Sequence, residues 1–129
     1  FGMPVVMLGG PGDRERADAI SADRGLVDLV GRTDIQTAAA IIGRAGYVVG
    51  VDTGLTHMGI AFDRPTVCLF GSTRPYTNTA TRRGRVLFHD LPCAPCRRNP
   101  TCDGSYDCMR ELVPDEVLSA VAGARESRQ

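Results

Sequence analysis

The sequence predicts an α/β domain in which helices cover both faces of a parallel β-sheet. Short apolar runs rich in β-branched residues, typical of buried strands, alternate along the 129-residue chain with segments whose apolar residues recur at helical spacing. Short links join these segments, an order that favours parallel strands connected by right-handed crossover helices. At this length the chain forms one domain with a core of ordinary size.

Five segments have the composition of strands, and glycine lies in the turn that follows each of the first four. They comprise residues 4–8, 26–30, 47–51, 66–70 and 85–88. The first and third are uninterrupted apolar runs, so we expect them to be buried. A cysteine-rich loop at about 91–110 follows the fifth strand.

Four segments are predicted to be helices. They comprise residues 13 to about 24, 34–45, 53–62, and a last segment that begins at Pro114. The second has the strongest periodicity, and Thr33 with Gln36 has capping-box spacing at its start. The last places Val117, Leu118 and Val121 on one face.

Glycine, threonine, serine and aspartate gather where the first four strands end. In a parallel sheet the carboxyl ends of the strands lie along one edge, where ligands bind. After the third strand, Asp52 and Thr53 are good N-cap residues and Gly54 permits close approach of the backbone. The unpaired N–H groups of the first helical turn then form an anion site. The sequence therefore predicts a nucleotide or phosphate site along this edge.

Composition and motifs exclude several classes of protein. The 15 basic residues, all arginine, balance 15 acidic ones, which argues against a general nucleic-acid binder. The sequence has no P-loop, no G-x-G-x-x-G spacing and no nucleophile elbow. No apolar run is long enough to span a membrane. Because the first residue is Phe1 rather than Met and an apolar stretch starts within three residues, we expect the chain to be part of a longer protein.

Three stretches together resemble glycosyltransferase family 9, the ADP-heptose:lipopolysaccharide heptosyltransferases. They are Leu29-Val30-Gly31-Arg32-Thr33, Asp52-Thr53-Gly54-Leu55-Thr56-His57 and Pro65-Thr66-Val67-Cys68-Leu69-Phe70-Gly71-Ser72-Thr73-Arg74-Pro75. The resemblance runs from Val5 to the last helix. It implies a GT-B architecture of two Rossmann-like domains, of which residues 1–129 match the C-terminal, donor-binding domain. The N-terminal acceptor domain, with the general base, would lie outside this chain.

The resemblance also implies roles for individual residues. Asp52 would hold hydroxyls of the donor sugar, Thr53 and Gly54 would offer backbone N–H groups to the diphosphate, and His57 would support that turn. The nucleotide side would be lined by Gly9, Gly10, Gly31 and Thr33. The implied donor is ADP-heptose and the implied acceptor is the lipopolysaccharide core, in the bacterial cytoplasm or at the inner face of the inner membrane. No catalytic residue is assigned to this half, which alone would bind nucleotide without turnover.

The chemistry of the transfer needs no metal in this half. A nucleotide-sugar donor requires stabilisation of the leaving diphosphate, which helix N-termini and arginine can provide. Asp52 is the lone acid on the predicted edge, so we expect donor binding without a metal cofactor. Arg74, in the loop after the fourth strand, is either the cation for the phosphates or a solvated loop charge.

The four cysteines of the loop form a second candidate site. Cys93 and Cys96 have the spacing of a zinc-ligand pair, and Cys102 and Cys108 follow at wider intervals. They either hold a structural zinc or iron ion or remain reduced thiols. This leaves a second interpretation of the chain: a non-catalytic α/β scaffold with a metal-stabilised interaction loop. A third is a different GT-B enzyme acting on a nucleotide-sugar, such as an epimerase.

Overall fold

The computed structural model describes residues 2–21, 25–73, 75, 79 and 81–126, without the side chains of 125 and 126. It divides into two compact units, Phe1–Ile41 and Ile42–Gln129. We describe each unit by itself. No helix in the described ranges is long and apolar enough to cross a membrane.

The first unit is built on a short parallel strand pair. Strands β1 (Val6–Met7) and β2 (Val27–Asp28) pair in register, and helix α1 (Arg14–Ser21) follows a 3-10 turn, η1 (Pro11–Asp13). The Arg14 guanidinium contacts both carboxylate oxygens of Asp28 and donates to the Val30 carbonyl at 2.7 Å. This fork fixes α1 against β2, because a bidentate arginine–carboxylate pair has a defined geometry.

Two expectations for this unit need correction. The strand predicted at 4–8 contributes only two residues to a ladder, and Val5 and Val6 are exposed rather than buried. In the described residues β1 pairs with β2 alone, so much of its apolar surface is left uncovered. Helix α2 (Ile35–Arg44) forms as predicted, but its cap is Asp34, whose carboxylate accepts the Thr37 N–H at 2.7 Å.

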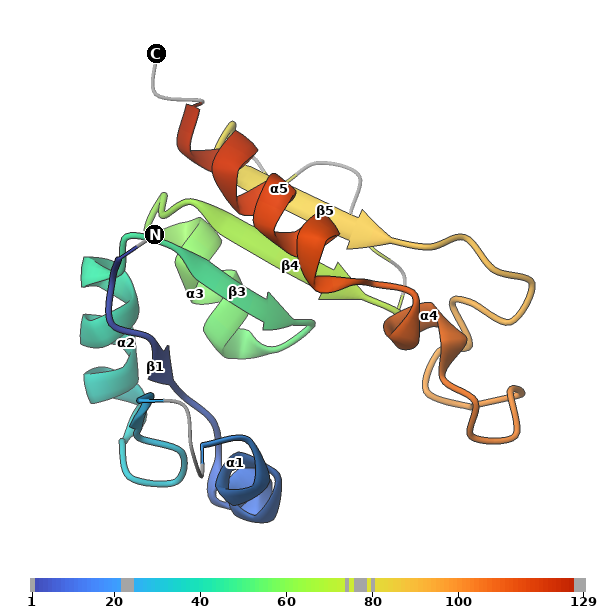
Figure 1. Cartoon of the computed structure of the whole chain (residues 1–129), viewed down its shortest axis with the longest axis horizontal. Coiled ribbons are helices and arrows are strands. Elements are labelled where there is room, and N and C mark those ends of the chain that lie inside the picture. Colours follow the sequence, from blue (N-terminus) through green and yellow to red (C-terminus); the bar gives the residue numbers. More distant parts are fainter. Residues whose placement is uncertain (1, 22–24, 74, 76–78, 80, 127–129) are drawn as a thin grey trace. The chain divides into compact units, whose positions relative to one another are not determined.

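The second unit is a three-stranded parallel sheet with helices on both faces. Strands β3 (Val48–Val51), β4 (Thr66–Phe70) and β5 (Gly84–Phe88) lie in the order β3-β4-β5. Helix α3 (Gly54–Ala61) packs on β3 and β4, whereas α5 (Pro114–Glu126) packs on β4 and β5. Figure 1 shows α5 in front of the sheet and α3 behind it. The predicted α/β architecture is confirmed in this unit.

The core of the second unit centres on β4. Its residues Thr66, Val67, Cys68 and Phe70 are almost completely buried, as expected for a central strand covered on both faces. Strand β3 differs from the prediction, since Val49 and Val51 are about half exposed. On α5, Val121 and Ala124 are buried, but Leu118 is exposed and does not share the predicted apolar face.

A short helix that the sequence pattern did not predict, α4 (Asp107–Arg110), connects the cysteine-rich loop to α5. It lies beside β4 at the end of the strand that leads into Gly71. A side chain at Gly71 would meet the sulfur atoms of Cys108 and Met109 at 2.9 and 2.8 Å. The loop is thus packed directly on the turn that follows β4.

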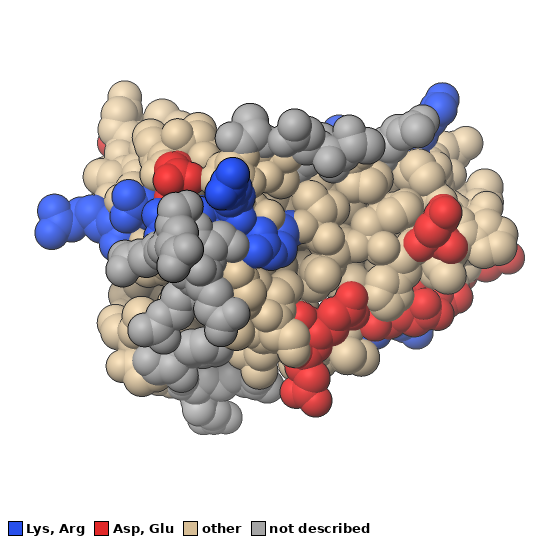
Figure 2. Space-filling model, turned by 90° about the horizontal axis from the view of Figure 1, so that it is seen from above, with Lys and Arg blue, Asp and Glu red and all other residues tan. Residues whose placement is uncertain are grey.

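His89 fastens the end of β5 to the start of α5. Its Nδ1 lies 3.3 Å from Glu111 Oε2, and its Nε2 lies 3.2 Å from Glu116 Oε2. The hydrogen bond to Glu116, and to a smaller extent the one to Glu111, raises the pKa of His89 above its ordinary value. Figure 2 shows acidic side chains lying next to one another on the face seen from above.

We therefore expect His89 to stabilise the fold in its protonated form. A raised folded-state pKa gives stability that is complete below the unfolded-state pKa of 6.5 and is lost as pH rises through the folded value. In urea unfolding, His89→Gln should lower the free energy of unfolding more at about pH 6 than at about pH 9. An equal loss at both values would show that the imidazolium charge contributes nothing.

Candidate functional site

The turn after β3 places an ionised carboxylate at the carboxyl end of the sheet. Asp52 Oδ1 accepts a hydrogen bond from His57 Nε2 at 2.9 Å, which requires the proton on Nε2 because a carboxylate can only accept. Two hydrogen bonds hold the pKa of Asp52 below its usual value. The larger effect comes from the hydroxyl of Thr73, in the turn after β4, and a smaller one comes from His57. Asp52 therefore remains charged at neutral pH and can accept hydrogen bonds from ligand hydroxyls.

The first turn of α3 offers backbone N–H groups beside this carboxylate. Thr53 is the N-cap residue with extended backbone, but its side chain makes no capping hydrogen bond. Its hydroxyl lies instead 3.4 Å from the hydroxyl of Thr56. Within the described residues, no side chain accepts a hydrogen bond from the N–H groups of Gly54, Leu55 or Thr56. They are therefore available to an anion.

Gly54 leaves open space in front of these groups. A Cβ atom built on Gly54 would meet no atom within 4 Å. The glycine is therefore not required by packing, in contrast to Gly50 and Gly59, where a side chain would strike Thr56 and Thr66. This favours the predicted role of Gly54, close approach of the backbone to a ligand.

The predicted glycines of the first unit come together at the ends of β1 and β2. The N–H of Gly31 donates to the carbonyl of Gly9 at 3.0 Å. The N–H of Gly10 is occupied by the carboxylate of Asp13 at 3.1 Å, which makes this turn poorly suited to a phosphate. Thr33, two residues after Gly31, has a half-buried side chain. That these residues share one ligand edge with Asp52 stays a prediction, because they belong to the other unit.

The cysteine-rich loop contributes thiols to the same end of β4. Cys93, Cys96, Cys102 and Cys108 are all free. The Cys96 thiol lies 3.9 Å from the Ser72 carbonyl, and burial raises the pKa of Cys108. Among the described side chains, no three His, Cys, Asp or Glu residues are arranged to hold a metal ion. Zinc or iron binding by these thiols therefore stays a prediction.

Two further residues bear on this site. Arg74, proposed as the cation, lies outside the described residues. Thr73 was not singled out, although it partners Asp52. Its position after β4 was the available signal, since β3 and β4 are adjacent and parallel and their following turns must meet.

Comparison with known proteins decides the family. A sequence profile described as glycosyltransferase family 9 (heptosyltransferase) matches residues 1–106. The chain belongs to this family. Neither the scaffold nor the epimerase interpretation agrees with this finding.

Relatives with assigned functions are similar over much of this chain. Lipopolysaccharide heptosyltransferase 1 of Pseudomonas aeruginosa is 39% identical over 95 residues, which cover 73% of this chain and 26% of the relative. Lipopolysaccharide heptosyltransferase 2 of Salmonella typhimurium is 28% identical over 124 residues, which cover 91% of this chain and 36% of the relative. The family 9 chain thus spans about a quarter to a third of the length of these relatives.

Solved structures agree with the fold. The E. coli ADP-heptose lps heptosyltransferase II superposes with a TM-score of 0.79 and 25% identity, covering 97% of this chain and 37% of the other. A family 9 glycosyltransferase from Veillonella parvula gives a TM-score of 0.74 at 22% identity. The family 9 chain therefore has the α/β fold of part of a GT-B glycosyltransferase.

Proposed function

We propose that this chain is the donor-binding part of a glycosyltransferase that moves heptose from ADP-heptose to the lipopolysaccharide core. One observation carries the proposal: an ionised Asp52, oriented by His57 and Thr73, stands beside the uncapped N-terminus of α3. A sugar diphosphate needs both partners, a hydroxyl acceptor and an anion site. The similarity to lipopolysaccharide heptosyltransferases supports the choice of donor and acceptor.

In this proposal each group has a defined task. The Asp52 carboxylate accepts hydrogen bonds from hydroxyls of the donor sugar and so fixes the orientation of its anomeric carbon. The N–H groups at the start of α3 bind the diphosphate and stabilise the charge that develops as the glycosidic bond breaks. His57 holds Asp52 in place and is a positioning residue. The acceptor and the general base come from outside this chain, and we propose that the reaction occurs on the cytoplasmic side of the membrane.

No metal ion is required for these tasks. Asp52 is the acid at the end of β3, and its described partners are His57 and Thr73 rather than a second carboxylate. The N–H groups at the start of α3 supply positive charge to the diphosphate without a metal ion. We therefore propose that donor binding is independent of divalent cations.

Calorimetric titration of the protein with ADP, GDP and UDP in the presence of a chelator tests this function. ADP is expected to bind most tightly of the three, and the affinity should not change when magnesium replaces the chelator. A folded protein that binds none of the nucleotides would contradict the proposal. Binding that requires magnesium would contradict its metal-independent form.

A further inference from the structure

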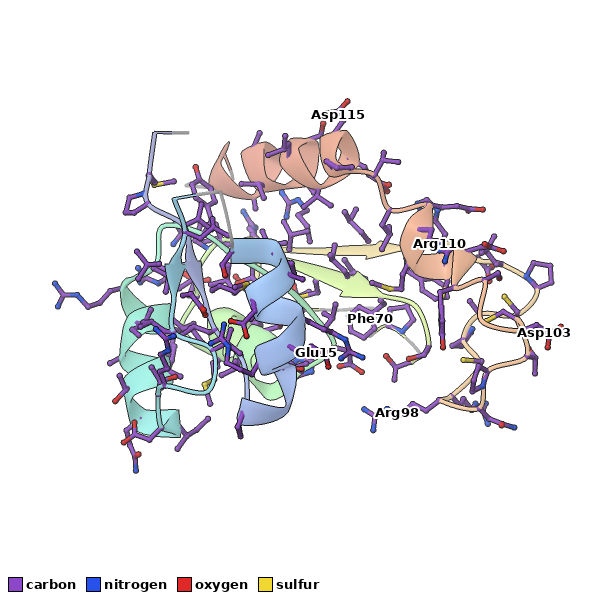
Figure 3. The ribbon with its side chains drawn as sticks, turned by 60° about the horizontal axis from the view of Figure 1, so that its bottom comes forward. Glu15, Phe70, Arg98, Asp103, Arg110 and Asp115 are labelled. Atoms are coloured by element: carbon purple, nitrogen blue, oxygen red, sulfur yellow. The ribbon has the colours of Figure 1, made fainter. Side chains whose placement is uncertain are left out.

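The cysteine-rich loop, which packs on the turn after β4, carries an arginine near the candidate site. Arg98 lies in this loop with an exposed side chain. Its charge is close enough to Asp52 to favour the ionised carboxylate, yet the two groups form no ion pair. Figure 3 shows Arg98 extending from the loop toward the side on which the sheet lies, whereas Asp103 lies on the far side of the loop.

The loop that carries Arg98 is held against the end of β4. The thiol of Cys96, two residues before Arg98, contacts the carbonyl of Ser72. Cys108 and Met109, at the other end of the loop, close on Gly71 so tightly that a Cβ there would overlap them. Thr73, two residues after Gly71, is the partner of Asp52. The packing of the loop therefore fixes the Arg98 backbone near the Asp52 turn.

The backbone of the loop supports a defined position for this arginine. Arg97 and Arg98 both have left-handed backbone, with φ of 54° and 66°. Such conformations cost a non-glycine residue energy and persist where the surroundings impose them, which is common at ligand clamps. In the described part of the chain the exposed Arg98 guanidinium has no hydrogen bond or ion pair. It is therefore free to bind an anion.

The charge balance of the site calls for such a cation. A diphosphate at the α3 N-terminus would lie next to the ionised Asp52, which repels it. The helix terminus offers only about half a positive charge. The chain contains no lysine, and its net charge of zero gives no general attraction for anions. A guanidinium near Asp52 offsets the repulsion and supplies paired donors that match phosphate oxygens.

We propose that Arg98 of the cysteine-rich loop binds the diphosphate of the nucleotide-sugar together with the N-terminus of α3. This inference rests on the proposed function. Arg98 lies outside the three stretches that carry the resemblance to family 9. The inference also gives the loop a purpose: the loop is the element that brings a cation to the carboxyl end of the sheet. Arg98 would recognise a phosphate ester. The affinity for a ligand without phosphate should therefore not depend on Arg98.

Titration with ADP and with adenosine tests the inference. Arg98→Gln is expected to weaken ADP binding about 10- to 100-fold, the range for a hydrogen-bonded charge pair, and to leave adenosine binding unchanged. Arg98→Lys should retain part of the ADP affinity because it keeps the charge. Arg97→Gln, in the neighbouring residue with the same backbone conformation, is the matched control and should bind ADP as the wild type does.

The outcomes separate this inference from the proposed function. If the wild type binds ADP and Arg98→Gln binds it equally well, the role of Arg98 is wrong while the nucleotide site stands. If ADP and adenosine affinities fall together in Arg98→Gln, the arginine only supports the fold, which also overturns the inference. If the folded wild type binds no ADP, the proposed function itself fails and the inference with it.

Discussion

Asp52→Ala is expected to weaken the binding of ADP-heptose about 10- to 100-fold without weakening the binding of ADP, because the lost carboxylate repels the diphosphate. The carboxylate is ionised and aimed by His57 and Thr73, so its proposed ligands are sugar hydroxyls, which ADP lacks at that position. Hydrogen bonds to a charged acceptor are about twice as strong as neutral ones, which sets the size of the loss. Calorimetric titration with both ligands measures it.

Two further variants separate charge from fold in this prediction. Asp52→Asn keeps a hydrogen-bonding group beside Thr73 but removes the charge, and it should lose most of the ADP-heptose affinity. Asp90→Ala removes an exposed aspartate that follows β5, at the other edge of the same three-stranded sheet, and should change neither affinity. A selective role for Asp52 would be contradicted if Asp52→Ala weakened ADP and ADP-heptose to the same degree.

Gly50→Ala is expected to lower the free energy of unfolding by about 1–3 kcal/mol, the usual cost of overpacking a core. A methyl group at Gly50 would overlap the hydroxyl of Thr56, a residue of α3 that is almost completely buried against the sheet. Helix α3 would have to move away from β3 and would carry the candidate anion site with it. Urea unfolding measures the loss, and nucleotide affinity should fall in parallel.

Matched substitutions make the Gly50 prediction specific. Gly123→Ala introduces the same methyl group in α5, where the nearest atom would be 3.9 Å away, and it should not destabilise the protein. Adding Thr56→Ala to Gly50→Ala removes the overlapping hydroxyl and should recover part of the lost stability. No recovery in the double variant would mean that the glycine matters for a reason other than this contact.

Local sequence patterns predicted the elements of the second unit well. The run 66–70 is β4 as predicted, and Pro114 begins α5, because apolar continuity and proline at a helix start depend on near neighbours. The turn with Asp52, Thr53, Gly54 and His57 was also found, since its polar residues follow directly on an apolar strand. In the structure Asp52 and His57 are joined by a hydrogen bond, and the role of this turn in ligand binding stays a prediction.

The remaining features depend on contacts between distant residues, which periodicity does not report. Burial of β3 was overestimated, because its side chains are half covered in the described structure although the run is apolar. Gly50 of β3 must be glycine because Thr56 of α3 packs directly on it. Asp52 and Thr73 become partners because β3 pairs with β4. Arg98 was missed because a loop without periodicity carries it.

Binding of ADP to Gly54→Ala tests the central claim most directly, because no atom of the described residues opposes a side chain at this position. If the diphosphate sits on the first turn of α3, the added methyl group separates it from the N–H groups. ADP affinity should then fall about tenfold or more, with no loss of stability. Gly123→Ala should bind ADP as the wild type does. Equal ADP affinity in Gly54→Ala and wild type would contradict the placement of the nucleotide at this helix.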